Sequence, residues 1–154
     1  AIADFKGASK RLEKIAENRQ TAVFKDFAHS PSKVEATTNA VKEQYANRKL
    51  LACLELHTYS SLNEDFLKEY VGTLDKADEA VVFYSPHAVK IKRLKEVSQE
   101  QIARAFKRDD LVIYTDPKEF KEFLFSQNLA DTTLLLMSSG NYGGLDFEEV
   151  KELL

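Results

Sequence analysis

Five short apolar runs, spread along the chain, constrain the fold more than any other feature. They cover residues 21–27, 49–56, 79–84, 110–114 and 132–137. Within residues 80–84 and 134–137 the apolar side chains are consecutive and do not alternate with polar ones, which is typical of parallel strands covered on both faces. The runs therefore predict five strands of a mainly parallel sheet.

Amphipathic segments separate the runs. Residues recur at helical spacing after the first run, at Val34, Thr37, Thr38, Val41 and Tyr45, and after the second, at Leu62, Phe66 and Tyr70. Helix-start signals precede three later segments: Ser98 with Gln101, Asp116 with Pro117, and Asp146 with Glu149. Strand and helix thus alternate five times, which predicts an α/β fold: a Rossmann-like, mainly parallel sheet with helices on both faces.

The length and charge of the chain narrow the class of protein. With 154 residues and a hydrophobic fraction of 44%, the chain suits one domain with one substantial core. Its 22 basic and 25 acidic residues are interspersed, which disfavours nucleic-acid binding. The single cysteine, Cys53, cannot form an intramolecular disulfide, and no apolar run approaches the roughly 20 residues that cross a bilayer. We therefore expect a cytoplasmic protein with no membrane partner.

The first twenty residues are polar and charged, and three interpretations of them stay open: a linker, a helix or an edge strand. The chain opens on Ala1 without an initiator methionine, as expected of a piece cut from something longer. We expect residues 1–20 to be a linker or edge segment from a preceding domain, and residues 21–154 to be the domain itself.

The loops that directly follow the strands hold all three histidines of the chain. His29 follows the first predicted strand, His57 the second and His87 the third. In open α/β sheets, ligands bind beyond the carboxyl ends of the strands. The shared placement of the histidines therefore predicts a site at this edge of the sheet.

The loop after the last predicted strand, residues 138–144, is rich in glycine. Glycines let a backbone approach a ligand closely, or expose amides to an anion. No Lys-Ser or Lys-Thr follows them, so this is not a phosphate-binding loop of the usual type, and no Gly-x-Gly-x-x-Gly follows the first strand. The sequence also offers no nucleophile elbow and no His/Cys cluster, so we expect no catalytic residue and no metal site within this chain.

One segment after the first predicted strand resembles a known motif. Asp26 to Pro31, Asp-Phe-Ala-His-Ser-Pro, is similar to the Asp-Tyr-Ala/Gly-His-x-Pro segment that opens the C-terminal domain of Mur ligases. Residues 5–13 resemble the Phe-x-Gly-x-x-x-Arg-x-Glu stretch that joins the central ATPase domain of that family to this domain. The resemblance covers essentially the whole chain. It implies the C-terminal domain of a ligase that joins cell-wall muramic acid precursors to amino acids or peptides.

Two members of the family share further segments with the chain. Residues 55–60 are similar to the Gln-Pro-His-Arg-Tyr-Thr motif of the L-alanine-adding member: His57 and Tyr59 match, whereas Thr58 and Ser61 replace two arginines. Residues 137–144 look most like the Met-Ser-Asn-Gly-Gly-Phe-Gly-Gly ending of murein peptide ligase, which attaches a preformed tripeptide to UDP-N-acetylmuramate. Because arginines would orient a free amino-acid carboxylate, their loss favours the tripeptide, L-Ala-γ-D-Glu-meso-diaminopimelate, with L-alanine as the alternative.

The resemblance also implies roles for individual residues. Asp26 and His29 would face the nucleotide and the domain junction. The amine-substrate pocket would be lined by His57, Tyr59, His87, Asn141 and Tyr142, with Gly140, Gly143 and Gly144 allowing close approach of the peptide. ATP and Mg²⁺ would be bound mainly by other domains, which would make this chain a fragment that is inactive alone. The rival interpretation is a non-catalytic α/β ligand-binding or regulatory module.

Overall fold

The apolar runs form a six-stranded sheet in the computed structural model, which describes residues 12–28, 30–56, 64–85 and 98–154. The strands are β1 (Glu13–Glu17), β2 (Thr21–Asp26), β3 (Lys49–Glu55), β4 (Glu79–Phe83), β5 (Val112–Tyr114) and β6 (Thr132–Met137). Their order in the sheet is β1-β2-β6-β3-β4-β5. β1 is antiparallel to β2 and all the other pairs are parallel, which confirms the predicted α/β class.

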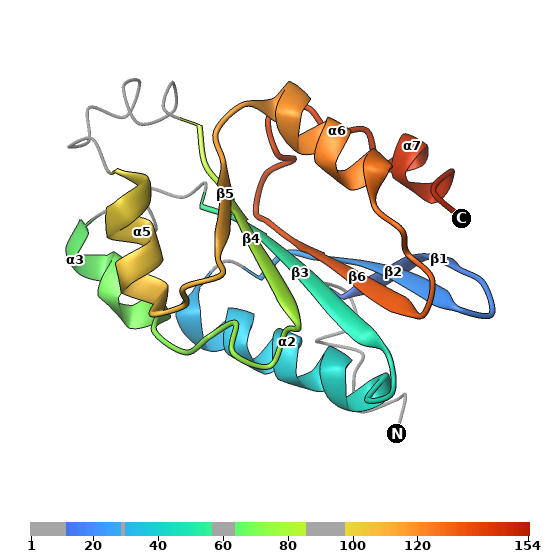
Figure 1. The fold of residues 1–154 in the computed structure, drawn as a ribbon, viewed down its shortest axis with the longest axis horizontal. Coiled ribbons are helices and arrows are strands. Elements are labelled where there is room, and N and C mark those ends of the chain that lie inside the picture. The colour runs from blue at the N-terminus through green and yellow to red at the C-terminus, as the bar shows by residue number, and fades with distance from the viewer. Residues whose placement is uncertain (1–11, 29, 57–63, 86–97) are drawn as a thin grey trace.

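Helices cover both faces of this sheet (Figure 1). One face carries α2 (Pro31–Gln44), α3 (Glu64–Leu67), the 3-10 helix η3 (Lys68–Tyr70) and α5 (Gln99–Phe106). The other face carries α6 (Pro117–Ser126) and α7 (Phe147–Lys151). The chain therefore runs from β2 to β5 with its helices on the first face, and returns to β6 through a helix on the second.

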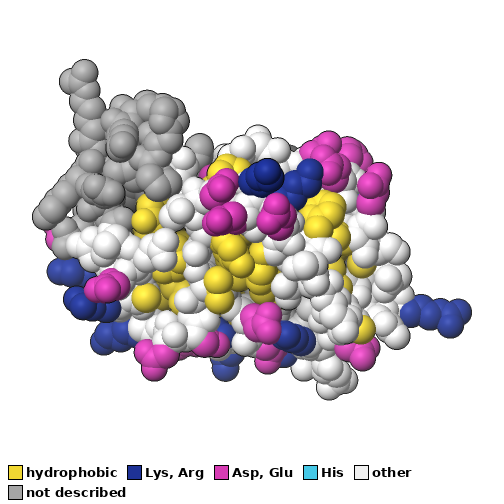
Figure 2. All heavy atoms as spheres, turned by 45° about the horizontal axis from the view of Figure 1, so that its top comes forward, with side chains coloured by type: hydrophobic (Ala, Val, Ile, Leu, Met, Phe, Trp, Pro, Cys, Tyr) yellow, Lys and Arg dark blue, Asp and Glu magenta, His cyan; other side chains and the backbone are white. Residues whose placement is uncertain are grey.

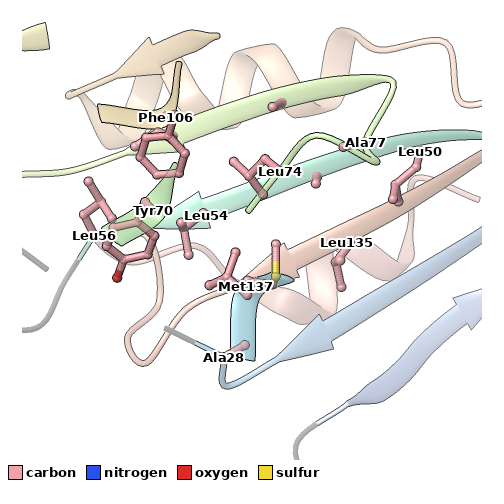
Figure 3. Close-up of a cluster of buried hydrophobic side chains, with 14 of the residues drawn as sticks. Ala28, Leu50, Leu54, Leu56, Tyr70, Leu74, Ala77, Phe106, Leu135 and Met137 are labelled. Atoms are coloured by element: carbon pink, nitrogen blue, oxygen red, sulfur yellow. The ribbon is translucent and has the colours of Figure 1, made fainter. Parts of the chain in front are cut away.

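Two apolar cores follow from this layering. In the core on the α2 face, Tyr70 stacks on Phe106 with ring centroids 5.2 Å apart, and Met137 of β6 lies in the same cluster (Figure 3). In the core on the α6 face, Phe120 and Leu124 of α6 pack against the sheet. All six residues of β6 are buried, because this strand lies inside the sheet and is covered on both faces.

β1 shows which interpretation of the N-terminal region holds for residues 13–17. They form an edge strand that pairs with β2, with a register shift between Lys14 and Ala16. The polar composition of this segment suits an edge, because charged side chains on an edge strand discourage pairing with other chains. Residues 1–11 lie outside the described part, and the division at residue 20 stays a prediction.

The three helix-start signals act as the sequence predicts. Ser98 and Gln101 form both hydrogen bonds of a capping box at the start of α5. The Asp116 side chain accepts a hydrogen bond from the backbone N–H of Lys118, and Asp146 does the same for Glu148. Each acceptor satisfies a backbone donor that has no partner within its helix.

β5 is shorter than the predicted run of residues 110–114. Its ladder with β4 begins only at Val112, which pairs with Val81. The two preceding residues belong to a turn, in which Arg108 Nε lies 2.7 Å from the Asp110 carboxylate and the Leu111 N–H donates to the Arg108 carbonyl. The turn therefore occupies the first two residues of the predicted run, and the strand begins after it.

Charges of both signs are interspersed on the surface. On the face that Figure 2 shows, acidic and basic side chains lie next to one another with hydrophobic side chains between them. The charges on that face are therefore mixed, as the interspersed acidic and basic residues of the sequence predict. Within the described ranges, no helix has the length and apolarity needed to span a membrane.

Asp78, just before β4, gives the fold a testable dependence on acid. Its carboxylate accepts hydrogen bonds from the Leu50 N–H at 2.7 Å and from Lys42 Nζ at 2.8 Å. Partial burial raises the pKa of Asp78, but these hydrogen bonds and the charge of Lys42 prevail and hold it below its usual value. The ionised carboxylate therefore stabilises the fold above the unfolded-state pKa of about 3.9, and this contribution is lost as pH falls through the lower folded-state pKa.

We expect Asp78→Asn to unfold more easily than the wild type at pH 7, by no more than about 1 kcal/mol because the pair is solvent-screened. The difference in free energy of unfolding should shrink as pH falls from 5 to 3, when the wild-type carboxylate also loses its charge. Urea titrations at pH 7, 5, 4 and 3 measure it. A difference that stays constant over this range would contradict the ionic role of Asp78.

Candidate functional site at the carboxyl edge of the sheet

The strand order places a topological switch point at the carboxyl end of β6. β6 lies between β2 and β3. The chain leaves β2 toward α2 on one face, whereas it leaves β6 toward α7 on the opposite face. Neighbouring strands whose connections leave in opposite directions mark the place where open α/β sheets bind ligands. The candidate site is therefore the set of residues at the ends of β2, β6 and β3.

Asp26 ends β2 on the α2 side of this edge. The residue is 4% exposed, and its carboxylate accepts a hydrogen bond from the Thr37 hydroxyl of α2 at 2.7 Å. Its backbone carbonyl accepts a hydrogen bond from the Ser138 N–H at 2.9 Å, which continues the pairing of β2 with β6 by one residue. Asp26 is thus held by α2 and by β6 together.

Glu55 ends β3 on the opposite face of the sheet. The residue is 3% exposed, and Oε1 accepts hydrogen bonds from the Ser138 hydroxyl at 2.5 Å and from the Tyr142 N–H at 2.8 Å. The Gly140 N–H donates in turn to the Ser138 hydroxyl oxygen at 2.7 Å. These contacts join the end of β3 to the glycine-rich loop. Neither Glu55 nor Ser138 is identified individually by a sequence motif, although a charged residue at the end of a buried strand is a usable signal.

Tyr142 belongs to the glycine-rich loop, and its side chain is buried in the core on the α6 face. Its ring stacks on Phe120 with centroids 4.8 Å apart, and its hydroxyl lies 2.7 Å from the Met137 carbonyl oxygen and 2.9 Å from that of Cys53. The residue is 1% exposed. Burial raises the pKa of the Tyr142 hydroxyl well above its usual value, so it remains a neutral donor. The structure thus gives Tyr142 a packing position, whereas its predicted contact with substrate stays a prediction.

The backbone of the loop turns through left-handed conformations at three consecutive residues. The φ angles are +55° at Tyr142, +73° at Gly143 and +115° at Gly144. A Cβ atom at Gly143 would lie 2.5 Å from Cγ of Pro117, whereas one at Gly144 would meet nothing within 4 Å. The absence of a side chain at Gly143 therefore serves contact with the first turn of α6, and at Gly144 it serves the backbone conformation and leaves open space.

Asn141 occupies the exposed tip of the loop. Its side-chain Oδ1 accepts a hydrogen bond from the Gly144 N–H at 3.1 Å, and its carbonyl accepts one from the Leu145 N–H at 2.7 Å. Gly143 and Gly144 are exposed beside it. The loop therefore presents a polar tip on a backbone that the core holds from below.

The other predicted site residues cannot be compared with the structure. His29, His57, Tyr59 and His87 lie outside the described residues. Among the described residues, no group of three His, Cys, Asp or Glu side chains lies close enough to hold a metal ion. The structure therefore brings together Asp26, the loop at residues 138–144 and Glu55. This arrangement can orient a ligand through a loop that is held at both ends.

The family to which the chain belongs follows from its sequence. The family described as Mur ligase, glutamate ligase domain, matches residues 10–140. The chain belongs to this family. The match spans every strand of the sheet, from β1 to β6, and the first residues of the glycine-rich loop.

Curated relatives of this Mur ligase domain are longer proteins. It is 26% identical over 148 residues to a UDP-N-acetylmuramate–L-alanine ligase of Ruthia magnifica subsp. Calyptogena magnifica, which covers 92% of this chain and 31% of that protein. It is 30% identical over 149 residues to the enzyme of the same name from Carboxydothermus hydrogenoformans, covering 96% of this chain and 32% of that protein. The chain thus spans about a third of the length of these relatives.

Solved structures share the fold of this Mur ligase domain. A murein peptide ligase from Psychrobacter arcticus superposes with a TM-score of 0.69 at 19% identity, over 92% of this chain and 29% of that chain. The UDP-N-acetylmuramate–alanine ligase from Thermotoga maritima gives a TM-score of 0.57 at 15% identity, over 90% of this chain and 27% of that chain. At identities below 25%, these superpositions show that the chains share a fold.

Proposed function

We propose that this Mur ligase domain is the C-terminal, amine-substrate-binding domain of an ATP-dependent ligase, and that the ligase joins UDP-N-acetylmuramate to a tripeptide. The family match over residues 10–140 carries the proposal. The position of the glycine-rich loop at the carboxyl end of β6 supports it, because Asn141 lies at the loop's tip where α/β sheets bind ligands. The segments that bind ATP, Mg²⁺ and the UDP-sugar are proposed to lie outside this sequence.

The proposed reaction has two steps. A carboxylate oxygen of UDP-N-acetylmuramate attacks the γ-phosphorus of ATP, and ADP leaves. The amine nitrogen of the second substrate then attacks the acyl carbon, loses a proton, and displaces inorganic phosphate. The residues of this chain would hold the amine substrate at that carbon and exclude water from the acyl phosphate, which water would hydrolyse.

Three observations bear on the choice of amine substrate. The glycine-rich loop and the loss of two arginines, at Thr58 and Ser61, favour the tripeptide L-Ala-γ-D-Glu-meso-diaminopimelate. The names of the curated relatives favour L-alanine as the second candidate. We propose the tripeptide, because a free amino acid offers a carboxylate close to its amine and would need a cation to orient it.

The proposal is tested with the full reading frame that carries this chain. The ratio of kcat/KM for tripeptide to that for L-alanine should exceed one, and a ratio below one would establish L-alanine as the substrate. His57→Ala should lower kcat/KM for the tripeptide by a factor of about 5 to 150, the loss expected for one buried hydrogen bond, while the KM values for ATP and UDP-N-acetylmuramate change little. A lower melting temperature with unchanged kinetic constants would remove His57 from the site.

A further inference from the structure

We infer that Glu55 is a positioning residue, which holds the loop at residues 138–144 in the conformation that presents Asn141 to the amine substrate. The consequence for the substrate rests on the proposed function. The contact itself does not, because it is present in the fold.

The carboxylate of Glu55 contacts the loop at two separate points. Oε1 accepts from the hydroxyl of Ser138, where the chain leaves β6, and from the N–H of Tyr142, four residues further on. Because both donors share one oxygen atom, the two ends of this short segment are held at a set separation. The Gly140 N–H, bonded to the Ser138 hydroxyl, adds a third point between them. Asn141 thus lies between two residues whose amides are both held.

The loop needs this support because its backbone is strained. Tyr142 has a φ of +55°, a conformation that residues other than glycine, asparagine and aspartate adopt rarely. The hydrogen bond from its N–H to Glu55 and the burial of its ring favour this conformation together. A change at Glu55 removes the first of these two supports and leaves the second in place.

The chemical type of residue 55 also indicates a role beyond packing. The six residues Leu50 to Glu55 are all buried, and the five before Glu55 are apolar. Burial of a carboxylate costs free energy that an apolar side chain of similar size would not cost, so packing alone does not account for glutamate here. With 3% exposure and two donors on Oε1, Glu55 acts through the loop rather than by touching the substrate.

The test compares four variants in the full reading frame. Glu55→Ala removes the acceptor, whereas Glu55→Gln keeps an oxygen at Oε1. Ser138→Ala removes one of the two donors and keeps Glu55, so it also reports if Glu55→Ala does not fold. Thr133→Val is the matched control on β6, because the buried Thr133 hydroxyl has no hydrogen-bond partner within the described part of the chain.

Two measurements separate positioning from general stability. Hydrogen–deuterium exchange of the peptide at residues 138–145 should become at least about tenfold faster in Glu55→Ala, and should change little in Glu55→Gln and Thr133→Val. The KM for the amine substrate should rise about tenfold in Glu55→Ala, and by less in Ser138→Ala, while the KM values for ATP and UDP-N-acetylmuramate stay within about twofold. Glu55→Gln should restore most of the affinity for the amine.

Two results would overturn the inference, and a third would overturn only the proposed function. Unchanged exchange of the loop in Glu55→Ala would overturn the inference. Faster exchange with an equal rise of KM for all three substrates would also overturn it, because a general structural role gives that pattern. If the wild type forms no product with either amine while the loop exchange still responds to Glu55→Ala, the proposed function fails and the contact of Glu55 with the loop stands.

Discussion

Replacement of Tyr142 by alanine should lower the free energy of unfolding by about 3–5 kcal/mol, the range for removing a large buried aromatic side chain. The ring lies within the core on the α6 face, in contact with both Phe83 and Phe120, so its removal leaves a cavity in that core. Urea denaturation followed by far-UV circular dichroism measures the loss.

Tyr142→Phe is the matched control, because it keeps the ring and removes the hydroxyl. The carbonyls of Cys53 and Met137 then lose a shared donor, and we expect a smaller loss of about 1–2 kcal/mol. A Tyr142→Ala protein as stable as the wild type, with altered kinetics for the amine substrate alone, would contradict the packing role. It would support the substrate contact that the family resemblance implies.

Gly143→Ala should destabilise the domain by about 2–4 kcal/mol, because a left-handed φ strains the new residue and its Cβ overlaps a neighbour. The overlap is with the ring of Pro117, the first residue of α6, at 2.5 Å from Cγ. The ring is held by the start of the helix, so the loop must shift to make room. Thermal unfolding of the two proteins under the same conditions measures the effect.

A double-mutant cycle with Pro117→Ala isolates the overlap. A proline at the first helical position contributes little hydrogen bonding, so Pro117→Ala alone should cost under about 1 kcal/mol. In the double variant the contact with Cγ is gone, although Cβ of residue 117 stays at 3.1 Å, and the loss from Gly143→Ala should fall by about 1–2 kcal/mol. Additive losses would show that the backbone conformation, and not contact with Pro117, requires the glycine.

Features of the fold that depend on local sequence could be predicted. Runs of apolar residues mark the five strands β2 to β6, and the capping box at Ser98 and Gln101 places the start of α5 correctly. The edge strand β1 could not be distinguished from a linker, because its residues are polar and its pairing with β2 is a tertiary contact. The predicted start of β5 was two residues too early, because a turn that contains Arg108 and Asp110 precedes the strand.

The candidate site could be predicted as an edge of the sheet but not as a set of contacts. A loop that follows a strand is recognisable from sequence, and the rule for α/β sheets places it at the carboxyl edge. The hydrogen bonds of Glu55 to Ser138 and Tyr142 span 83 and 87 residues of sequence, and no periodicity or motif records such pairs. The family motif likewise does not tell whether Tyr142 points outward or into the core.

Identification of the ligated product tests the central claim most directly. The full-length protein is incubated with ATP, Mg²⁺, UDP-N-acetylmuramate and the tripeptide, and the products are identified by mass spectrometry alongside ADP and phosphate. We expect one UDP-N-acetylmuramyl tripeptide for each ADP, and neither product nor ADP from residues 1–154 alone. ATP hydrolysis by residues 1–154 alone, or no product from the full-length protein with either the tripeptide or L-alanine, would contradict the account.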